Sequence, residues 1–269
     1  MKSTLDPLAG FKEAQKQGWS TFAPLEALTT PPAGRLVRFA AVRSGQRVLD
    51  VACGTGVVAV TAARLGAKVA GLDLTPALLE RARENSQIAG VEVDWREGDA
   101  EALPFADGEF DVVLSQFGHM FAPRPDVATS ELLRVLKPGG TIAFSTWPPE
   151  LPMGRIFALV AQHLPPPPEG VAPPPLWGDP NVVRERLGQR VRDLEFARGD
   201  MMAPVLSPAH YRVQLEQGSG PVRRVVETLA TTDPDRLASF RRAYDALLST
   251  ALEDNQLRMG YLMSRAVKI

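Results

Sequence analysis

The sequence lacks several features that would mark common protein classes. Its single cysteine, Cys53, excludes an intramolecular disulfide and any metal site built from several thiolates. No stretch approaches the roughly 20 apolar residues that a membrane-spanning helix needs, and residues 1–6 lack the apolar run of a secretory signal peptide. Charges are nearly balanced, with 30 Lys and Arg against 31 Asp and Glu, and no basic cluster indicates nucleic-acid binding. We therefore expect a cytoplasmic protein without a membrane span, a metal site or a nucleic-acid partner.

Composition and periodicity indicate one elaborated α/β unit. The 269 residues are 45% hydrophobic and 23% charged, which is typical of a globular chain. Between residues 45 and 147, short apolar runs alternate with helical patterns, and this alternation favours βαβ units in a mostly parallel sheet with helices on both faces, as in Rossmann-like folds. The expected strands are 47–52, 69–74, 91–98, 111–117 and 141–147, and the expected helices are 57–65, 76–88 and 127–136.

The second half of the sequence is less regular. Two proline runs, 165–168 and 173–175, predict a stiff, extended loop. A cap followed by proline predicts a helix from 180 to 188, and alternation predicts a strand within 191–205. Residues 207–254 have helical periodicity, and 257–267 read as a final strand. This order places a helical insert between the last two strands.

A glycine-containing turn follows the first expected strand, in the segment Asp50-Val51-Ala52-Cys53-Gly54-Thr55-Gly56. Its glycines allow a tight turn and let a ligand approach the backbone, at the strand ends where open parallel sheets bind ligands. By itself the motif is ambiguous, because Gly54 to Ala59 also satisfies the dinucleotide pattern G-x-G-x-x-G/A and Asp73 falls where a ribose-binding acid is expected.

Three further features favour a methionine-containing ligand over a dinucleotide. The carboxylate of Asp50 would repel a pyrophosphate but attract an α-amino group. Asp99, after the third expected strand, is placed to accept a hydrogen bond from an adenine amino group. The third feature is the pair of motifs 110–115 and 131–140, which have the sequences Phe-Asp-Val-Val-Leu-Ser and Glu-Leu-Leu-Arg-Val-Leu-Lys-Pro-Gly-Gly.

With these motifs in this order, residues 45–147 resemble the class I S-adenosylmethionine (SAM) dependent methyltransferases, most closely the UbiE-like branch. The resemblance implies SAM as cofactor and a seven-stranded sheet whose last strand is antiparallel. It also implies a single methyltransferase domain with a helical cap (1–44), a SAM-binding core (45–147), an acceptor-side region (148–256) and a final strand (257–269). The cofactor residues that it implies are Asp50, Ala52, Gly54, Gly56, Asp73, Leu74, Asp99, Ala100 and Ser115.

The acceptor side offers fewer signals. His119 follows the fourth expected strand, and if it faced the crevice its neutral imidazole could take a proton from an acceptor; the alternative is that it packs among neighbouring apolar residues. Aromatic side chains suit a cavity that handles a cationic methyl group. Besides His119, the expected acceptor contacts are Trp19, Phe22, Trp147 and Tyr211.

These observations predict transfer of a methyl group to an O, N or C atom of a small, partly apolar molecule. Ser115-Gln116-Phe117-Gly118 stands where nucleic-acid N-methyltransferases have Asn/Asp-Pro-Pro-Tyr, so that branch is disfavoured. Two alternatives remain open at this point. One is an NAD(P)-dependent oxidoreductase, and the other is a SAM-binding regulatory protein without turnover.

Overall fold

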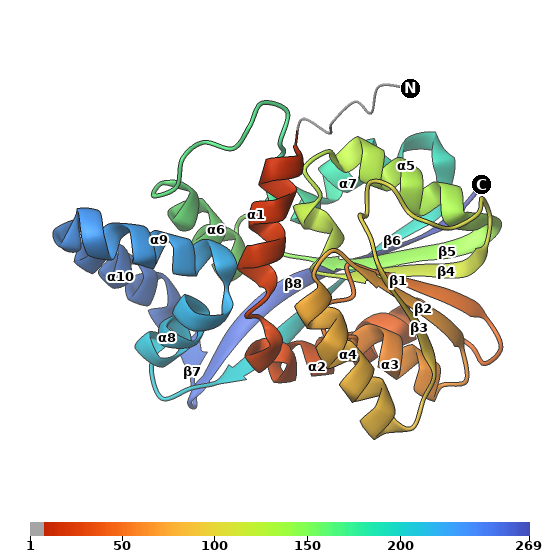
Figure 1. Ribbon diagram of the computed structural model, residues 1–269, viewed down its shortest axis with the longest axis horizontal. Coiled ribbons are helices and arrows are strands. Elements are labelled where there is room, and N and C mark those ends of the chain that lie inside the picture. Colours follow the sequence, from red (N-terminus) through yellow and green to blue (C-terminus); the bar gives the residue numbers. More distant parts are fainter. Residues whose placement is uncertain (1–7) are drawn as a thin grey trace.

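One mixed β-sheet forms the centre of the protein (Figure 1). The computed structural model describes residues 8–269, so the expectation for residues 1–6 lies outside the described residues. The strand order is β3-β2-β1-β4-β5-β8-β6, and the short strand β7 pairs with β8. The strands are β1 Arg47–Val51, β2 Lys68–Asp73, β3 Val93–Glu97, β4 Phe110–Gln116, β5 Leu136–Thr146, β6 Val191–Pro204, β7 Leu252–Glu253 and β8 Gln256–Lys268.

The topology creates a crevice between two neighbouring strands. β1 pairs in parallel with both β2 and β4, while β8 is antiparallel to both β5 and β6. The chain therefore moves outward from β1 through β2 to β3, then returns and continues on the other side of β1 with β4. Connections leave β1 and β4 in opposite directions, and this is where open α/β sheets bind ligands. The predicted fold class and antiparallel last strand are confirmed, with β7 as an eighth, two-residue strand.

Helices cover both faces of the sheet because the side chains of its strands alternate between two cores. Val48 packs with residues of α2 and α3, whereas the next residue, Leu49, belongs to a separate core with residues of α5. In Figure 1, α3 and α5 accordingly lie on opposite sides of the sheet. The α-helices are α1 Ala9–Trp19, α2 Glu26–Phe39, α3 Val57–Arg64, α4 Pro76–Ala89, α5 Pro125–Val135, α6 Pro152–Ala161, α7 Pro180–Leu187, α8 Pro208–Gly218, α9 Gly220–Thr232 and α10 Pro234–Ser249.

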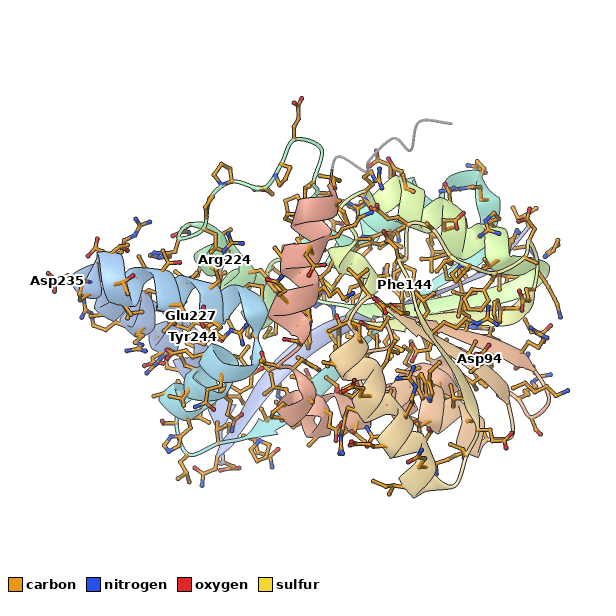
Figure 2. All side chains as sticks on the ribbon, in the orientation of Figure 1. Asp94, Phe144, Arg224, Glu227, Asp235 and Tyr244 are labelled. Carbon is orange, nitrogen blue, oxygen red and sulfur yellow. The ribbon has the colours of Figure 1, made fainter. Side chains whose placement is uncertain are left out.

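Helices α8, α9 and α10 form the insert between β6 and β8, and they gather with α6 beside α1 at one end of the sheet (Figure 1). Their outer faces are polar, as the exposed side chains of Arg224, Glu227 and Asp235 show, while Phe144 is buried on β5 (Figure 2). Of the helices described, none combines the length and the apolar character that crossing a membrane requires.

Two local expectations need correction. Helix α6 has no counterpart in the sequence-based prediction. Strand β5 begins at Leu136, although the expected helix extended to residue 136 and the expected strand began only at 141. The Pro-Gly-Gly segment is accommodated within the strand because Gly139 adopts a φ of 76° and the pairing with β4 shifts register between Phe110 and Val112.

Candidate active site

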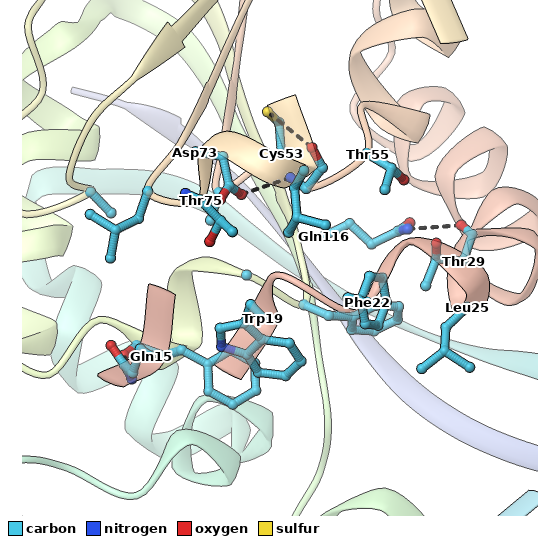
Figure 3. Close-up of a pocket in the computed structure, with 18 of the residues that line it drawn as sticks. Gln15, Trp19, Phe22, Leu25, Thr29, Cys53, Thr55, Asp73, Thr75 and Gln116 are labelled. Atoms are coloured by element: carbon cyan, nitrogen blue, oxygen red, sulfur yellow. Dashed lines mark hydrogen bonds between the residues drawn. The ribbon is translucent and has the colours of Figure 1, made fainter. Parts of the chain in front are cut away.

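A cavity lies at the carboxyl ends of β1, β2 and β4, with α1 along its side (Figure 3). It has two parts of different chemistry. The loop half is formed by residues 50, 52–55, 57, 58, 72–75, 78 and 98–100, at or just beyond the carboxyl ends of β1, β2 and β3, together with Lys12 of α1. The aromatic half is formed by Gln116 at the end of β4, by residues 117, 118 and 121–123 of the segment that follows, and by side chains from α1, α2, α6, α8, β6 and the segments beside them. Its large apolar members are Trp19, Phe22, Leu25, Leu28, Phe117, Phe121, Trp147, Met153, Phe157, Met201, Tyr211 and Leu215.

The two glycines of the turn after β1 have different roles. Gly54 lines the cavity with a φ of 56°, and a Cβ built on it would meet nothing within 4 Å. Gly56 does not line the cavity, and its Cβ would lie 2.5 Å from the Trp95 ring and 3.1 Å from Ala82. The expectation that Gly56 faces the ligand is therefore wrong: this glycine lets α3 begin close to α4 and β3. Gly54 is the position that leaves room for a ligand.

Asp50 ends β1 as a buried acid with one free oxygen. Its side chain is 1% exposed; Oδ2 accepts a hydrogen bond from the Ala59 amide at 3.0 Å, and Oδ1 has no hydrogen-bond partner within residues 8–269. Burial raises the pKa of Asp50 to about 8, and the nearby Asp73 carboxylate contributes to the increase. A cationic ligand group at Oδ1 would satisfy both the unpartnered oxygen and the unfavourable charge.

Asp73 ends β2 and holds two loops together. Its Oδ2 accepts from the Gly54 amide at 2.8 Å and its Oδ1 from the Thr75 amide at 2.8 Å. Burial raises the pKa of this carboxyl, although both backbone hydrogen bonds oppose the increase. Each oxygen has a second lone pair, so Asp73 can still accept hydrogen bonds from the cavity that it lines.

Helix α1 is fastened over the loop half by charge and by close packing. The buried Lys12 ammonium lies 2.7 Å from both the Asp99 and the Glu101 carboxylates, in the loop that follows β3. At the other end of the helix, Gly18 meets Gly220 of α9 so closely that a Cβ on Gly220 would lie 2.5 Å from the Gly18 Cα. Because α1 is held at both ends, Trp19 has a fixed place in the cavity wall.

The loops after β1 and β4 touch each other at Gly118. A Cβ on this residue would lie 2.5 Å from both the Cβ and the carbonyl oxygen of Ala52, so only glycine fits. Ser115 supports the same junction: its hydroxyl donates to the Val51 carbonyl at 2.7 Å and accepts from the His119 amide at 3.0 Å. Ser115 does not line the cavity, whereas the residues that follow it, 116–118, do.

The aromatic half has a rigid wall of stacked rings. Phe117 and Trp147 stack with ring centroids 3.9 Å apart and an interplanar angle of 12°. Across the cavity, Trp19 packs against Phe22 and Phe121. The Tyr211 hydroxyl points toward the Met153 sulfur, at 3.8 Å, and burial raises the pKa of this phenol. These contacts leave an apolar surface on which a flat or branched hydrophobic molecule can pack.

His119 does not face the crevice, so its expected location is wrong. Its side chain is fully buried and absent from the cavity wall, between the rings of Phe144 at 4.6 Å and Trp177 at 4.7 Å. Neither ring nitrogen has a hydrogen-bond partner within the described residues, and burial lowers the pKa to about 3, with Arg186 nearby. The catalytic role depended on that location, and a packing role replaces it.

Most of the other expected site residues line one cavity. In the loop half these are Asp50, Ala52, Gly54, Asp73, Leu74, Asp99 and Ala100; in the aromatic half they are Trp19, Phe22, Trp147 and Tyr211. Sequence reasoning missed Lys12, Gln116 and the α6 residues Met153 and Phe157. Strand alternation offered a signal for Gln116, because successive side chains of a strand point in opposite directions. The hydroxyl of its neighbour Ser115 donates a hydrogen bond to the Val51 carbonyl of β1, so the Gln116 side chain must point the other way.

Comparison with known proteins gives this geometry a context. Residues 49–144 match a family described as a methyltransferase domain. An uncharacterised protein of Mycobacterium tuberculosis is 36% identical over 244 residues, which cover 90% of this chain and 89% of that protein. The demethylmenaquinone methyltransferase of Thermus thermophilus is 41% identical over 128 residues, covering 47% of this chain and 57% of that enzyme.

Solved structures share the fold. A putative methyltransferase from Bacillus halodurans superposes with a TM-score of 0.60 at 22% identity, covering 88% of this chain and 98% of that one. The phosphoethanolamine N-methyltransferase 2 of Haemonchus contortus, solved with S-adenosyl-L-methionine, gives a TM-score of 0.51 at 22% identity, covering 87% of this chain and 51% of that enzyme.

Proposed function

The chain belongs to the class I SAM-dependent methyltransferases, and from this premise we propose that it methylates an O, N or C atom of a small, partly apolar molecule. The observation that carries the proposal is the joining of two chemically different surfaces in one cavity. Carboxylates and tight turns form the loop half, and stacked rings form the aromatic half. A polar cofactor and an apolar acceptor would therefore meet at the boundary between them.

The loop half fits SAM residue by residue. Asp50 Oδ1 would receive the α-ammonium group, and Ala52 and Gly54 would let the methionine part lie against the turn. Asp73 would accept hydrogen bonds from the ribose hydroxyls. Asp99 and Ala100 would contact the adenine edge, with Leu74 packing on the adenine face.

SAM supplies an electrophilic methyl group on a sulfonium, so the chain has to orient an acceptor and keep water out. Residues 116–118 lie at the boundary, next to the turn after β1. The ring faces of Phe117 and Trp147 would stabilise positive charge there. The residues that line the boundary include no general base, which suits an alignment mechanism.

Several finer statements belong to the same proposal. We place the chain near the UbiE-like branch because the Thermus relative, a demethylmenaquinone methyltransferase, matches 47% of it. We further propose one methyltransferase domain, a cytoplasmic location and a small-molecule acceptor in preference to nucleic acid.

Calorimetric titration with SAM, S-adenosylhomocysteine and NADH tests the cofactor assignment. We expect both adenosyl ligands to bind and NADH not to bind. Incubation with SAM labelled in its methyl group and a panel of neutral, cationic and anionic acceptors then tests turnover. Label transfer to an acceptor supports the proposal, whereas tight SAM binding without transfer to any member of the panel supports a regulatory protein.

A further inference from the structure

Two residues that line the cavity each have a buried side-chain oxygen without a hydrogen-bond partner within residues 8–269. One of these oxygens is Asp50 Oδ1 in the loop half. The other is Oε1 of Gln116, at the carboxyl end of β4 in the aromatic half. A buried acceptor without a partner is unfavourable, and in a cavity wall it indicates a ligand group that donates.

The orientation of the Gln116 amide is fixed by its other end. Nε2 donates to the main-chain carbonyl of Thr29, on α2, at 2.8 Å (Figure 3). A carbonyl oxygen can only accept, so a flipped amide would bring two acceptors together and is excluded. Oε1 is therefore held as an acceptor. In Figure 3, Gln116 lies between two groups of residues. Cys53 and Asp73 are on one side of it, and the rings of Trp19 and Phe22 are on the other.

Charge restricts the acceptor further. The only cationic side chain among the described residues that line the cavity is Lys12, which belongs to the loop half and is engaged by Asp99 and Glu101. A carboxylate or phosphate in the aromatic half would be buried without a counter-charge. Two other polar side chains there are committed: the Thr29 hydroxyl donates to the Glu26 carbonyl within its helix, and the Tyr211 hydroxyl is directed at the Met153 sulfur.

We propose that Gln116 selects the methyl acceptor: Oε1 accepts a hydrogen bond from an O–H or N–H group of an uncharged aromatic or otherwise apolar molecule. Gln116 is thereby a specificity residue that places a hydroxyl- or amine-bearing edge of the acceptor beside the cofactor turn. The inference rests on the proposed function, because it names the acceptor class for that site.

Three matched probes test the inference by binding alone: 2-naphthol, 2-methoxynaphthalene and 2-naphthoate, which differ in a donor, an ether and a carboxylate. Their affinities for the protein saturated with S-adenosylhomocysteine are measured by ligand-observed NMR. We expect 2-naphthol to bind about three- to tenfold more tightly than the ether, as for one neutral hydrogen bond, and 2-naphthoate to bind most weakly.

Gln116→Met should remove the preference for 2-naphthol over the ether while S-adenosylhomocysteine affinity stays within about twofold, a margin within the error of additivity at separate sites. Gln15→Met is the matched control, because Gln15 also lines the cavity and donates to a main-chain carbonyl, that of Phe121, at 2.9 Å. This control should keep the preference. Gln116→Leu repeats the test if the methionine variant does not fold.

The outcomes separate clearly. Equal affinities of the parent for 2-naphthol and the ether, tighter binding of 2-naphthoate, or no binding of any probe would each overturn the inference without any variant. A preference that survives in Gln116→Met, or is lost in both variants, would do the same. A large loss of S-adenosylhomocysteine affinity in Gln116→Met would assign the residue to the cofactor instead. Failure of the parent to bind S-adenosylhomocysteine would contradict the proposed function itself.

Discussion

The two halves of the cavity are built in opposite ways. Apart from Lys12, the loop half comes from three short segments, within 50–58, 72–78 and 98–100, each at or just beyond the carboxyl end of a parallel strand. The aromatic half gathers side chains from α1, α2, α6, α8, β6 and the end of β4, so its members range from Trp19 to Ser219. The first half is a property of local turns and strand ends. The second exists only when distant elements pack, and we expect a change there to affect acceptor binding more than cofactor binding.

The largest effect should come from the two glycines of the turn. Gly54→Val should reduce SAM affinity by more than about 100-fold, because the new side chain occupies space that belongs to the ligand. Gly56→Val carries a similar backbone strain but collides with Trp95, so it should lower the free energy of unfolding by on the order of 3 kcal/mol. Calorimetry and chemical denaturation distinguish the two. Normal SAM binding by folded Gly54→Val would show that the turn does not face the cofactor.

Removal of the β2 acid should have the next largest effect. Asp73→Ala loses charge-assisted hydrogen bonds worth about 1.5–3 kcal/mol, which corresponds to SAM affinity about 10- to 150-fold weaker. It also releases the Gly54 and Thr75 amides that the carboxylate holds. Asp94→Ala removes an exposed acid from β3 (Figure 2) and is the control. If both variants bind SAM as the parent does, the ribose assignment is incorrect.

Asp50 should make cofactor binding depend on pH. With a pKa of about 8 before binding, the carboxyl must lose its proton to pair with an ammonium group. SAM affinity should therefore increase about 25-fold from about pH 6 to about pH 7.5, with release of a proton. Asp50→Asn should remove this dependence and weaken binding at the upper pH. Calorimetry in buffers of different ionisation enthalpy measures the proton directly, and an equal pH dependence in the variant would contradict the assignment.

Ionisation of Asp50 should lower the stability of the folded protein in the absence of ligand. Because the pKa of Asp50 is higher in the folded protein than in the unfolded chain, the folded state binds more protons between about pH 4 and about pH 8. The contribution of Asp50 to stability is thus lost as the pH rises through this range. Thermal unfolding at pH 8 should show Asp50→Asn to be at least as stable as the parent, the reverse of its effect on binding.

His119 should have the smallest effect on function. His119→Leu should leave SAM affinity and turnover within about twofold of the parent, because the residue packs behind the wall. The substitution should instead change the dependence of stability on acid. Because the pKa of His119 is about 3 in the folded protein, only the unfolded chain binds a proton at this histidine between about pH 3 and about pH 6.5. The stability of the parent should therefore fall as the pH drops through about 6.5. The variant should lose less stability there. The exposed His210 provides a control substitution; a large fall in turnover for His119→Leu alone would restore a catalytic role.

The contrast between the halves also explains how far the sequence could be interpreted. Alternating patterns located the core strands to within a few residues, except β5, and strand-end acids such as Asp50 and Asp73 were visible because a buried charge at such a place needs a partner. His119 was misplaced because periodicity ends at the strand, and the 3-10 helix His119–Phe121 turns its ring inward. Helix α6 was missed although its sequence is amphipathic at helical period, and its cavity-lining face is set by packing against α10 and β8.

The place of β8 in the sheet has a consequence for synthesis of the chain. Among the described residues, β6 pairs with no strand other than β8, and β8 is made about fifty residues later, after the three insert helices. While the ribosome is producing those helices, the nascent chain exposes the open edge of β5 and the whole of β6. Unpaired strand edges favour association with other chains. The insert helices must therefore emerge before β8 can pair with β5 and β6. We expect the aromatic half of the cavity to assemble in the same late step in which the sheet is completed.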